Sequence, residues 1–332
     1  MRPLLAIVAV LVLVGAGGVI YLLAPWRSPP TIRAPTAPYV PSGPDVRALL
    51  WALGDGADGG AAAHSSVERM KRTRLDRVLY LGDVYGSGPL SLLTGDGTAA
   101  DYRDHYDPLY GAFAARSAPT PGNHEWRQRG EDYEPYWGKV FGTPPPAYYA
   151  FDVAGWQLLS LNSEAPHGAR SAQVRWLREQ LLAPGTCRLA FWHAPRFSAG
   201  RHGDQPHVEP LWDALRGRAT IAVAGHDHNM QRLQPADGIT QYVSGAGGHG
   251  ATRCAATLGW PSATTARSGR CASSSRPAAR VPRSSRRTAG SSTCTRCAAR
   301  ANGRMNPPLP GDAERRRRSR CVRVVGEDPV RR

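Results

Sequence analysis

Short apolar runs alternate with polar segments over residues 46–250. Runs of this length, rich in Val, Leu, Ile, Tyr and Trp and bounded by Gly, Pro, Asn or Asp, predict β-strands. The predicted strands cover residues 46–53, 77–81, 148–153, 156–161, 188–192, 219–224 and 239–244. Ala154-Gly155 separates two of these runs, and this pair predicts a hairpin turn.

Helical spacing is visible in two segments of the same region. Residues 172–182 are predicted to form a helix whose apolar face carries Val174, Leu177, Leu181 and Leu182. A shorter helix is predicted over residues 209–215. Because these helices alternate with strands, the pattern indicates an α/β domain, with its functional site where the strands end.

The amino-terminal segment is apolar on every face. After Met1-Arg2-Pro3, residues 4–25 carry no charge. About 20 such residues cross a bilayer as a helix, whereas a cleavable signal peptide has a shorter apolar region and a small-residue cleavage site. We therefore predict a transmembrane anchor over residues 1–26, with a signal segment as the alternative. The Pro-rich residues 27–45 are predicted to form an extended linker.

This anchor implies a location. We expect the protein to use its N-terminal segment as a membrane partner and to place the domain on the extracytoplasmic face, or to be secreted if the segment is cleaved. Arginines flank the apolar segment on both sides, so they do not fix its orientation.

The charge of the chain is unevenly distributed. The 332 residues carry a formal net charge of +16. Residues 1–250 hold 23 Lys or Arg against 22 Asp or Glu, whereas residues 251–332 hold 19 Arg, no Lys and 4 acidic residues. The part that carries the strand pattern is thus almost neutral and does not indicate a nucleic-acid partner.

Beyond Gly250 the apolar alternation stops, and Arg, Ser, Ala, Thr and Cys dominate. Low hydrophobicity with high charge predicts a disordered tail over residues 251–332. The segment Ser268–Ser275 can be encoded so that a neighbouring frame gives alternating apolar residues, and we hypothesise that the tail comes from a shifted reading frame. The alternatives are a basic arm that binds nucleic acid or anionic lipid, and a solvated tail without a role.

Five polar clusters follow apolar runs at the points where the predicted strands end. They are Gly54-Asp55, Gly82-Asp83-Val84-Tyr85, Gly122-Asn123-His124-Glu125, Trp192-His193-Ala194-Pro195 and Gly225-His226-Asp227-His228. Each cluster alone is compatible with an ordinary turn or helix cap. Together they supply carboxylate, amide and imidazole groups, which suit Fe, Mn or Zn better than Mg or Ca.

The five clusters, in this order, resemble those of the calcineurin-like metallophosphoesterases, with a lean towards the purple acid phosphatase branch. The resemblance covers roughly residues 48–250. It implies a four-layer sandwich of two mixed β-sheets flanked by helices, so the metallophosphoesterase domain is expected over residues 46–250. It also implies two divalent or trivalent metal ions (Fe, Zn or Mn), with Asp83 bridging them. The remaining expected ligands are Asp55 and His228 for the first metal and Asn123, His193 and His226 for the second.

Two positions depart from the family pattern. The family opens with Asp-x-His, but residue 57 is Ala, which favours the branch in which a tyrosinate supplies an extra ligand. That branch places its Tyr three residues after the bridging Asp, whereas Tyr85 is two residues after Asp83. Tyr85 is therefore expected either to bind the first metal or to line the pocket.

A phosphoester repels hydroxide and has a poor leaving group. Two cations roughly 3.5–4 Å apart clamp the phosphoryl oxygens and lower the pKa of a bound water. The resemblance implies that His124 gives a proton to the leaving group, and His202 is expected to contact phosphate, with Arg201 or Arg196 as its charge partner. We thus expect hydrolysis of phosphate mono- or diesters by a metal-bound hydroxide.

Two other readings of the function stay open. The chain could be an inactive or destabilised phosphoesterase scaffold, or an anchored binding protein that uses its Arg-rich tail. The substrate would be selected by residues 86–116 and 126–147, which we expect to be pocket-lining loops and which carry no readable motif.

Overall fold

The computed structural model describes residues 8–15, 18–25, 32–35, 39–43, 47–86, 96–184, 186–250, 252, 270–272 and 321–325. The chain divides into two units, residues 1–31 and residues 32–332.

The described residues of the N-terminal unit form two paired β-strands in place of the predicted transmembrane or signal helix. Strand β1 (Val8–Gly15) pairs antiparallel with β2 (Gly18–Pro25), from Gly15 opposite Gly18 to Val8 opposite Pro25. Alternating valines favour a strand, and glycine at the turn disfavours a continuous helix. Within the described part of the chain, every helix is too short or too polar to span a bilayer.

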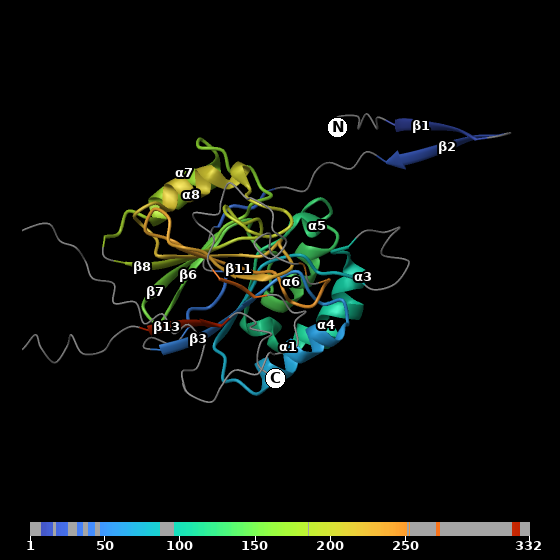
Figure 1. Cartoon of the computed structure of the whole chain (residues 1–332). Coiled ribbons are helices and arrows are strands. Elements are labelled where there is room, and N and C mark those ends of the chain that lie inside the picture. Colours follow the sequence, from blue (N-terminus) through green and yellow to red (C-terminus); the bar gives the residue numbers. More distant parts are fainter. Residues whose placement is uncertain are drawn as a thin grey trace, which may run out of the picture. The chain divides into compact units, whose positions relative to one another are not determined.

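The larger unit contains two β-sheets (Figure 1). The first has seven strands in the order β12-β10-β11-β9-β8-β7-β6 and mixes parallel with antiparallel pairs. Its strands are β6 (Tyr149–Val153), β7 (Trp156–Ser160), β8 (Cys187–Phe191), β9 (Ile221–Ala224), β10 (Met230–Arg232), β11 (Thr240–Ser244) and β12 (Arg270–Ala272).

The second sheet has the order β13-β3-β4-β5, and all its pairs are parallel. Its strands are β3 (Arg47–Leu53), β4 (Arg77–Tyr80), β5 (Ser117–Pro119) and β13 (Cys321–Val325). The expectation of two mixed sheets is therefore wrong for this one. Helical crossovers join β3 to β4 and β4 to β5, and such crossovers connect parallel strands.

The helices cover more of the chain than the pattern predicts. They are α1 (Ala61–Lys71), α3 (Ala99–Asp101), the π-helical η1 (Tyr102–Tyr106), α4 (Asp107–Tyr110), the 3-10 helix η2 (Gly111–Arg116), α5 (Asn123–Trp126), α6 (Tyr133–Phe141), α7 (Ala172–Gln180), η3 (Pro206–Val208) and α8 (Glu209–Leu215). Residues 99–116 and 133–141, expected to be loops, are thus helical. Leu182, expected on the apolar face of the α7 helix, is 73% exposed because the helix ends at Gln180.

Three clusters of buried side chains order these elements into layers. One lies between the two sheets, one between the parallel sheet and helices such as α1, α4 and α6, and one between the mixed sheet and helices α7 and α8. Alternate residues of β3 point in opposite directions: Leu50 faces the other sheet, and Trp51 faces the helices. The predicted α/β class is confirmed, and the layers run helices, sheet, sheet, helices.

Part of the predicted Pro-rich linker is packed into this unit. Tyr39 and Val40 are buried in the cluster between the sheets. The Tyr39 ring lies 4.9 Å from the Phe141 ring, and the amide of Gly43 donates to the carbonyl of Asp152 on β6 at 2.8 Å. A free extended linker is therefore the wrong description of residues 39–43, because two apolar side chains within the Pro-rich stretch are taken into the core.

The segment predicted as a disordered tail supplies two edge strands. β12 pairs antiparallel with β10 in the mixed sheet, and β13 pairs in parallel with β3 in the other sheet. The prediction of disorder is therefore wrong at these two strands. Apart from Thr252, the rest of the tail lies outside the described residues.

Candidate metal centre

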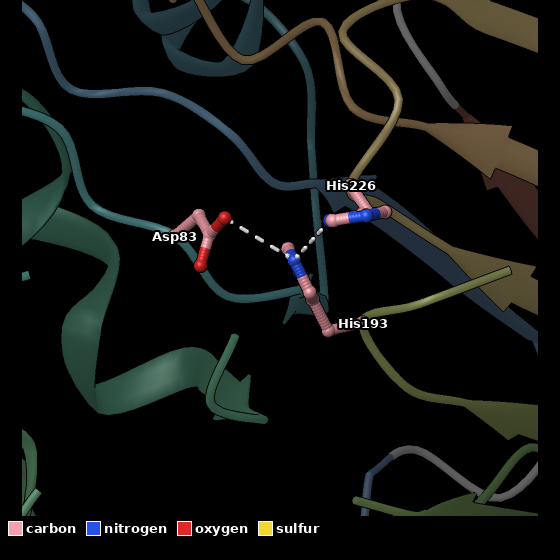
Figure 2. A group of neighbouring side chains, drawn as sticks. All are labelled: Asp83, His193 and His226. Carbon is pink, nitrogen blue, oxygen red and sulfur yellow. Dashed lines mark hydrogen bonds and ion pairs between the residues drawn. The ribbon is translucent and has the colours of Figure 1, made fainter. Parts of the chain in front are cut away.

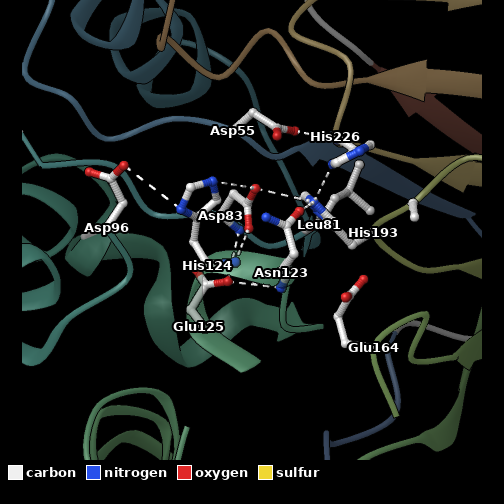
Figure 3. A network of polar contacts seen from close by, with 12 residues as sticks. Asp55, Leu81, Asp83, Asp96, Asn123, His124, Glu125, Glu164, His193 and His226 are labelled. Atoms are coloured by element: carbon white, nitrogen blue, oxygen red, sulfur yellow. Dashed lines mark hydrogen bonds and ion pairs between the residues drawn. The ribbon is translucent and has the colours of Figure 1, made fainter. Parts of the chain in front are cut away.

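The predicted ligands come together where strands of both sheets end. Asp55 follows β3, Asp83 follows β4 and Asn123 lies just beyond β5, while His193 and His226 follow β8 and β9 of the mixed sheet (Figure 3). The carboxyl ends of parallel strands open on the same side of a sheet, where an α/β fold binds its ligands. The sandwich thus gathers residues that are up to 171 positions apart in the sequence.

The backbone turns sharply at three of these positions. Asp55, Asp83 and His226 have φ angles of 57°, 56° and 68°, in the left-handed region that costs most residues energy. Two glycines make the turns possible by close approach: a side chain at Gly82 would overlap the backbone of Gly122, and one at Gly122 would overlap Oδ1 of Asp83. These turns direct the side chains of Asp55, Asp83 and His226 towards one another.

His193 lies at the centre of this volume and is fully buried. Its Nδ1 lies 2.8 Å from the carbonyl oxygen of Leu81, which can only accept, so Nδ1 carries a hydrogen. In the neutral ring, Nε2 then holds a lone pair. That atom lies 3.1 Å from Nδ1 of His226 and 3.2 Å from Oδ2 of Asp83 (Figure 2). It also lies 3.1 Å from Oδ1 of Asn123.

This convergence of acceptors requires a positive charge. Burial disfavours the charged forms of both Asp83 and His193, yet Asp83 raises the pKa of His193 and His193 lowers that of Asp83. One ligand atom from each of Asp83, His193 and His226 lies within 4.8 Å of the others. A metal ion would supply the charge, and the backbone carbonyl that fixes Nδ1–H is the usual second partner of a metal-binding His.

Beside this cluster lies a second group of donors. Asp55 is fully buried, and its Oδ2 accepts from the amide of His226 at 2.7 Å, while Oδ1 has no hydrogen-bond partner among the described residues. Nε2 of His228 lies 3.6 Å from this unpaired oxygen. A buried carboxylate oxygen without a donor is costly unless a cation binds it, so this group also fits a metal ion.

Tyr85 reaches the same place in spite of its shorter spacing from Asp83. Its hydroxyl lies 3.3 Å from Oδ2 of Asp83 and 3.1 Å from Nε2 of His228. Burial raises the pKa of the Tyr85 hydroxyl above its usual range, and the nearby carboxylates raise it further. The position of the hydroxyl suits a ligand that gives up its proton only to a metal.

The two later histidines are held neutral. Burial, together with the charge of neighbouring histidines, lowers the pKa of His226 to about 3 and that of His228 to about 4. Neutral imidazole is the form that binds a metal.

His124 and His202 lie at the edge of the site. The His124 side chain is 34% exposed, and its ring nitrogens lie 3.8 Å from Oδ2 of Asp83 and 3.8 Å from Oδ2 of Asp96 (Figure 3). The His202 ring lies 4.5 Å from the ring of His226. Of the two arginines expected near His202, Arg196 is paired with Glu209 and Arg201 is exposed.

Glu125 supports the site, although its motif predicts no role for it. Its buried carboxylate accepts from the amides of Gly122, Asp83 and Val84 at 2.8, 3.0 and 2.7 Å. Burial and the neighbouring Asp83 raise the pKa of Glu125 to about 7. One side chain thereby ties the turn after β4 to the start of α5. The available signal was the position of Glu125 three residues after Gly122, from which a carboxylate can accept from the N-cap amide.

Replacing Glu125 by alanine is expected to lower the free energy of unfolding by roughly 3 kcal/mol, because three buried amides lose their acceptor. Urea unfolding of the full chain measures the change. Glu68→Ala on the exposed face of α1 is the matched control and should leave the midpoint almost unchanged. Equal midpoints for the two variants would show that Glu125 does not hold the two loops together.

His249 is a second residue without a predicted role. Its ring stacks on that of Tyr85 with centroids 3.8 Å apart and an interplanar angle of 4°. Nδ1 of His249 lies 3.6 Å from Oδ2 of Asp58. The stacked ring limits the rotation of Tyr85 beside the site.

Comparison with known proteins agrees with this geometry. The family model described as calcineurin-like phosphoesterase matches residues 45–230. Tartrate-resistant acid phosphatase type 5 of Homo sapiens is 36% identical over 96 residues, which are 27% of this chain and 29% of that protein. The same phosphatase of Rattus norvegicus is 35% identical over 85 residues, 24% of this chain and 25% of that protein. The chain thus matches about a quarter of the length of these relatives.

Among solved structures, a purple acid phosphatase from yellow lupin (Lupinus luteus) seeds has a TM-score of 0.47 at 16% identity and covers 66% of this chain and 46% of that one. A dimetal phosphatase from Danio rerio has a TM-score of 0.39 at 16% identity, and the match covers 62% of this chain and 87% of that one. The sequence matches to acid phosphatases support the branch expected from the motifs. The family model matches residues 45–230, which are more than half of this chain. The chain therefore belongs to the calcineurin-like phosphoesterase family.

Proposed function

We propose that this chain is a metal-dependent phosphoesterase that hydrolyses phosphate mono- or diesters with two metal ions. The observation that carries the proposal is the convergence of three acceptor atoms around Nε2 of His193, next to the unpaired Oδ1 of Asp55. Two adjacent groups of acceptors, each short of positive charge, suit a pair of cations.

The proposed ligands divide between the two groups. Asp83 lies between them and would be shared. Asp55, Tyr85 and His228 would hold one metal, and Asn123, His193 and His226 the other. The donor set suits Fe, Zn or Mn. When bound, such metals clamp phosphoryl oxygens and lower the pKa of water, so that a nucleophile is available near neutral pH.

The chain's own residues would handle the proton and the phosphate. His124, which is accessible to solvent and lies 3.8 Å from Asp83, would donate a proton to the leaving oxygen. Proton transfer from a positioned His is worth about 10²–10⁴ in rate. His202, exposed beside His226, would donate a hydrogen bond to a phosphoryl oxygen.

The test uses the purified full chain with 4-nitrophenyl phosphate and bis(4-nitrophenyl) phosphate. We expect turnover of at least one ester, loss of turnover after chelation, and recovery when Fe, Zn or Mn is returned, with two metals per chain by mass spectrometry. Full turnover by metal-free protein would contradict the proposal. A protein that binds two metals and cleaves neither ester would be the inactive scaffold.

We also propose an extracytoplasmic location, supported only by the uncharged apolar residues 4–25. Protease treatment of intact cells would remove the domain if it lies outside, and full protection of the domain would contradict this location.

A further inference from the structure

A buried carboxylate ties the loop between β8 and η3 to the site. Asp227 stands between His226 and His228 in the sequence, but its side chain turns towards the loop that carries His202. Oδ1 of Asp227 accepts from the amide of His202 at 2.9 Å, and Oδ2 accepts from the hydroxyl of Ser198. Both oxygens are thus bonded to the loop.

Ser198 extends this anchor into a buried network. Its hydroxyl accepts from the amide of Gly200 at 2.9 Å and from Nε2 of Gln231 at 2.8 Å, while it donates to Asp227. Oε1 of Gln231 accepts from the amide of Ala199 at 2.8 Å. A buried network in which each of these groups is bonded holds a segment in one conformation.

The loop lies against the carboxylate without a gap. A methyl group at Gly200 would collide with the carboxylate of Asp227, although the backbone of Gly200 is outside the left-handed region and tolerates an L side chain. Held in this way, the His202 ring lies 4.5 Å from the His226 ring and 6.2 Å from the His228 ring.

We propose that Asp227 is a positioning residue that fixes the Ser198–His202 loop so that His202 faces the phosphoryl group. This inference rests on the proposed phosphoesterase function. It accounts for a carboxylate between two proposed ligands that does not itself point at the metals. Without the anchor, His202 would sample many positions. The free energy of phosphate binding would then include the entropic cost of ordering the loop.

The test is Gly200→Ala, which is expected to push the loop off the carboxylate and replaces none of the proposed ligands. Gly168→Ala is the matched control, because a methyl group there meets nothing within 4 Å. Phosphate affinity is measured by calorimetry on the metal-loaded full chain, and metal content by mass spectrometry. We expect Gly200→Ala to bind phosphate about tenfold more weakly, equivalent to about 1.4 kcal/mol, with metal content unchanged. The control should match the wild type.

A double-mutant cycle then asks whether the effect passes through His202. In a His202→Ala background, Gly200→Ala should change phosphate affinity by less than about twofold, because the two changes remove the same interaction. Ser198→Ala should behave as Gly200→Ala does and replaces it if that variant does not fold. Independent effects in the cycle, unchanged affinity in both loop variants, or loss of metal from them would overturn the inference.

The two proposals fail differently. Wild-type protein that neither binds phosphate in the metal-loaded state nor cleaves an ester would overturn the phosphoesterase function itself. Wild-type protein that does both, combined with additive effects in the cycle, would overturn only the role of Asp227.

Discussion

Asp83→Asn is expected to reduce phosphate-ester turnover by at least about a thousandfold and to release metal from the protein. Charge stabilisation by metal ions is worth several kcal/mol in such reactions, and each 1.36 kcal/mol is a factor of ten. Oδ2 of Asp83 contacts both His193 and Tyr85, so it faces both proposed metals. An amide keeps the shape of the side chain but removes its charge from the pair of sites.

This prediction is tested by measuring the turnover of 4-nitrophenyl phosphate and, by mass spectrometry, the metal content of the same protein. Asp152→Asn is the matched control, because that side chain is exposed on β6 and far in sequence from every proposed ligand. A variant at position 83 with near-normal rate and two bound metals would rule out Asp83 as the shared ligand.

His124→Ala is expected to slow turnover by about 10²–10⁴ while both metals stay bound. The His124 ring lies outside the acceptor cluster around His193, and its partial exposure leaves it open to a substrate. The loss should be larger for an alkyl phosphate than for 4-nitrophenyl phosphate. An alkoxide needs a proton as it leaves, whereas 4-nitrophenolate is stable without one.

His64→Ala on the exposed face of α1 serves as the control for this variant and should leave both rates unchanged. Loss of metal from His124→Ala would make His124 a ligand. Equal losses with the two leaving groups would show that His124 does not protonate the leaving oxygen.

The strands and helices built from aliphatic residues were predictable from the sequence. α8 spans Glu209–Leu215, the predicted residues, and β6 and β7 form the hairpin expected around Ala154-Gly155. Apolar side chains alternate along these strands and recur at helical spacing along the helix because one face of each element is buried. The sequence pattern therefore shows which face is buried.

The helices that lie between β4 and β5 in the sequence were missed for a physical reason. Their buried faces carry aromatic residues such as Tyr102, Tyr106 and Tyr110, and these pack through ring contacts. The three tyrosines stand four residues apart, which is a helical spacing, and part of this segment is a π-helical turn between α3 and α4. A search for aliphatic residues at that period does not detect such a face.

The proposed ligands could be assigned from the motifs, whereas the supporting residues Glu125 and Asp227 stood in the same motifs without a predicted role. Asp83 and Asn123 follow strands, so strand ends locate them. Glu125 and Asp227 act by accepting hydrogen bonds from backbone amides elsewhere in the chain. Backbone amides belong to every residue except proline, so sequence spacing cannot show which amide a carboxylate will meet.

The burial of Tyr39 and Val40 between the sheets determines where proteolytic processing can release this domain intact. The carbonyl of Arg33 accepts from the amide of Ala147, and the amide of Gly43 donates to Asp152. A protease that cuts before Ile32 would leave all of these contacts in the product. Cleavage between Gly43 and Arg47 would instead detach two core side chains from the product. A shed form that stays folded is therefore expected to retain residues 33–43 at its new amino terminus.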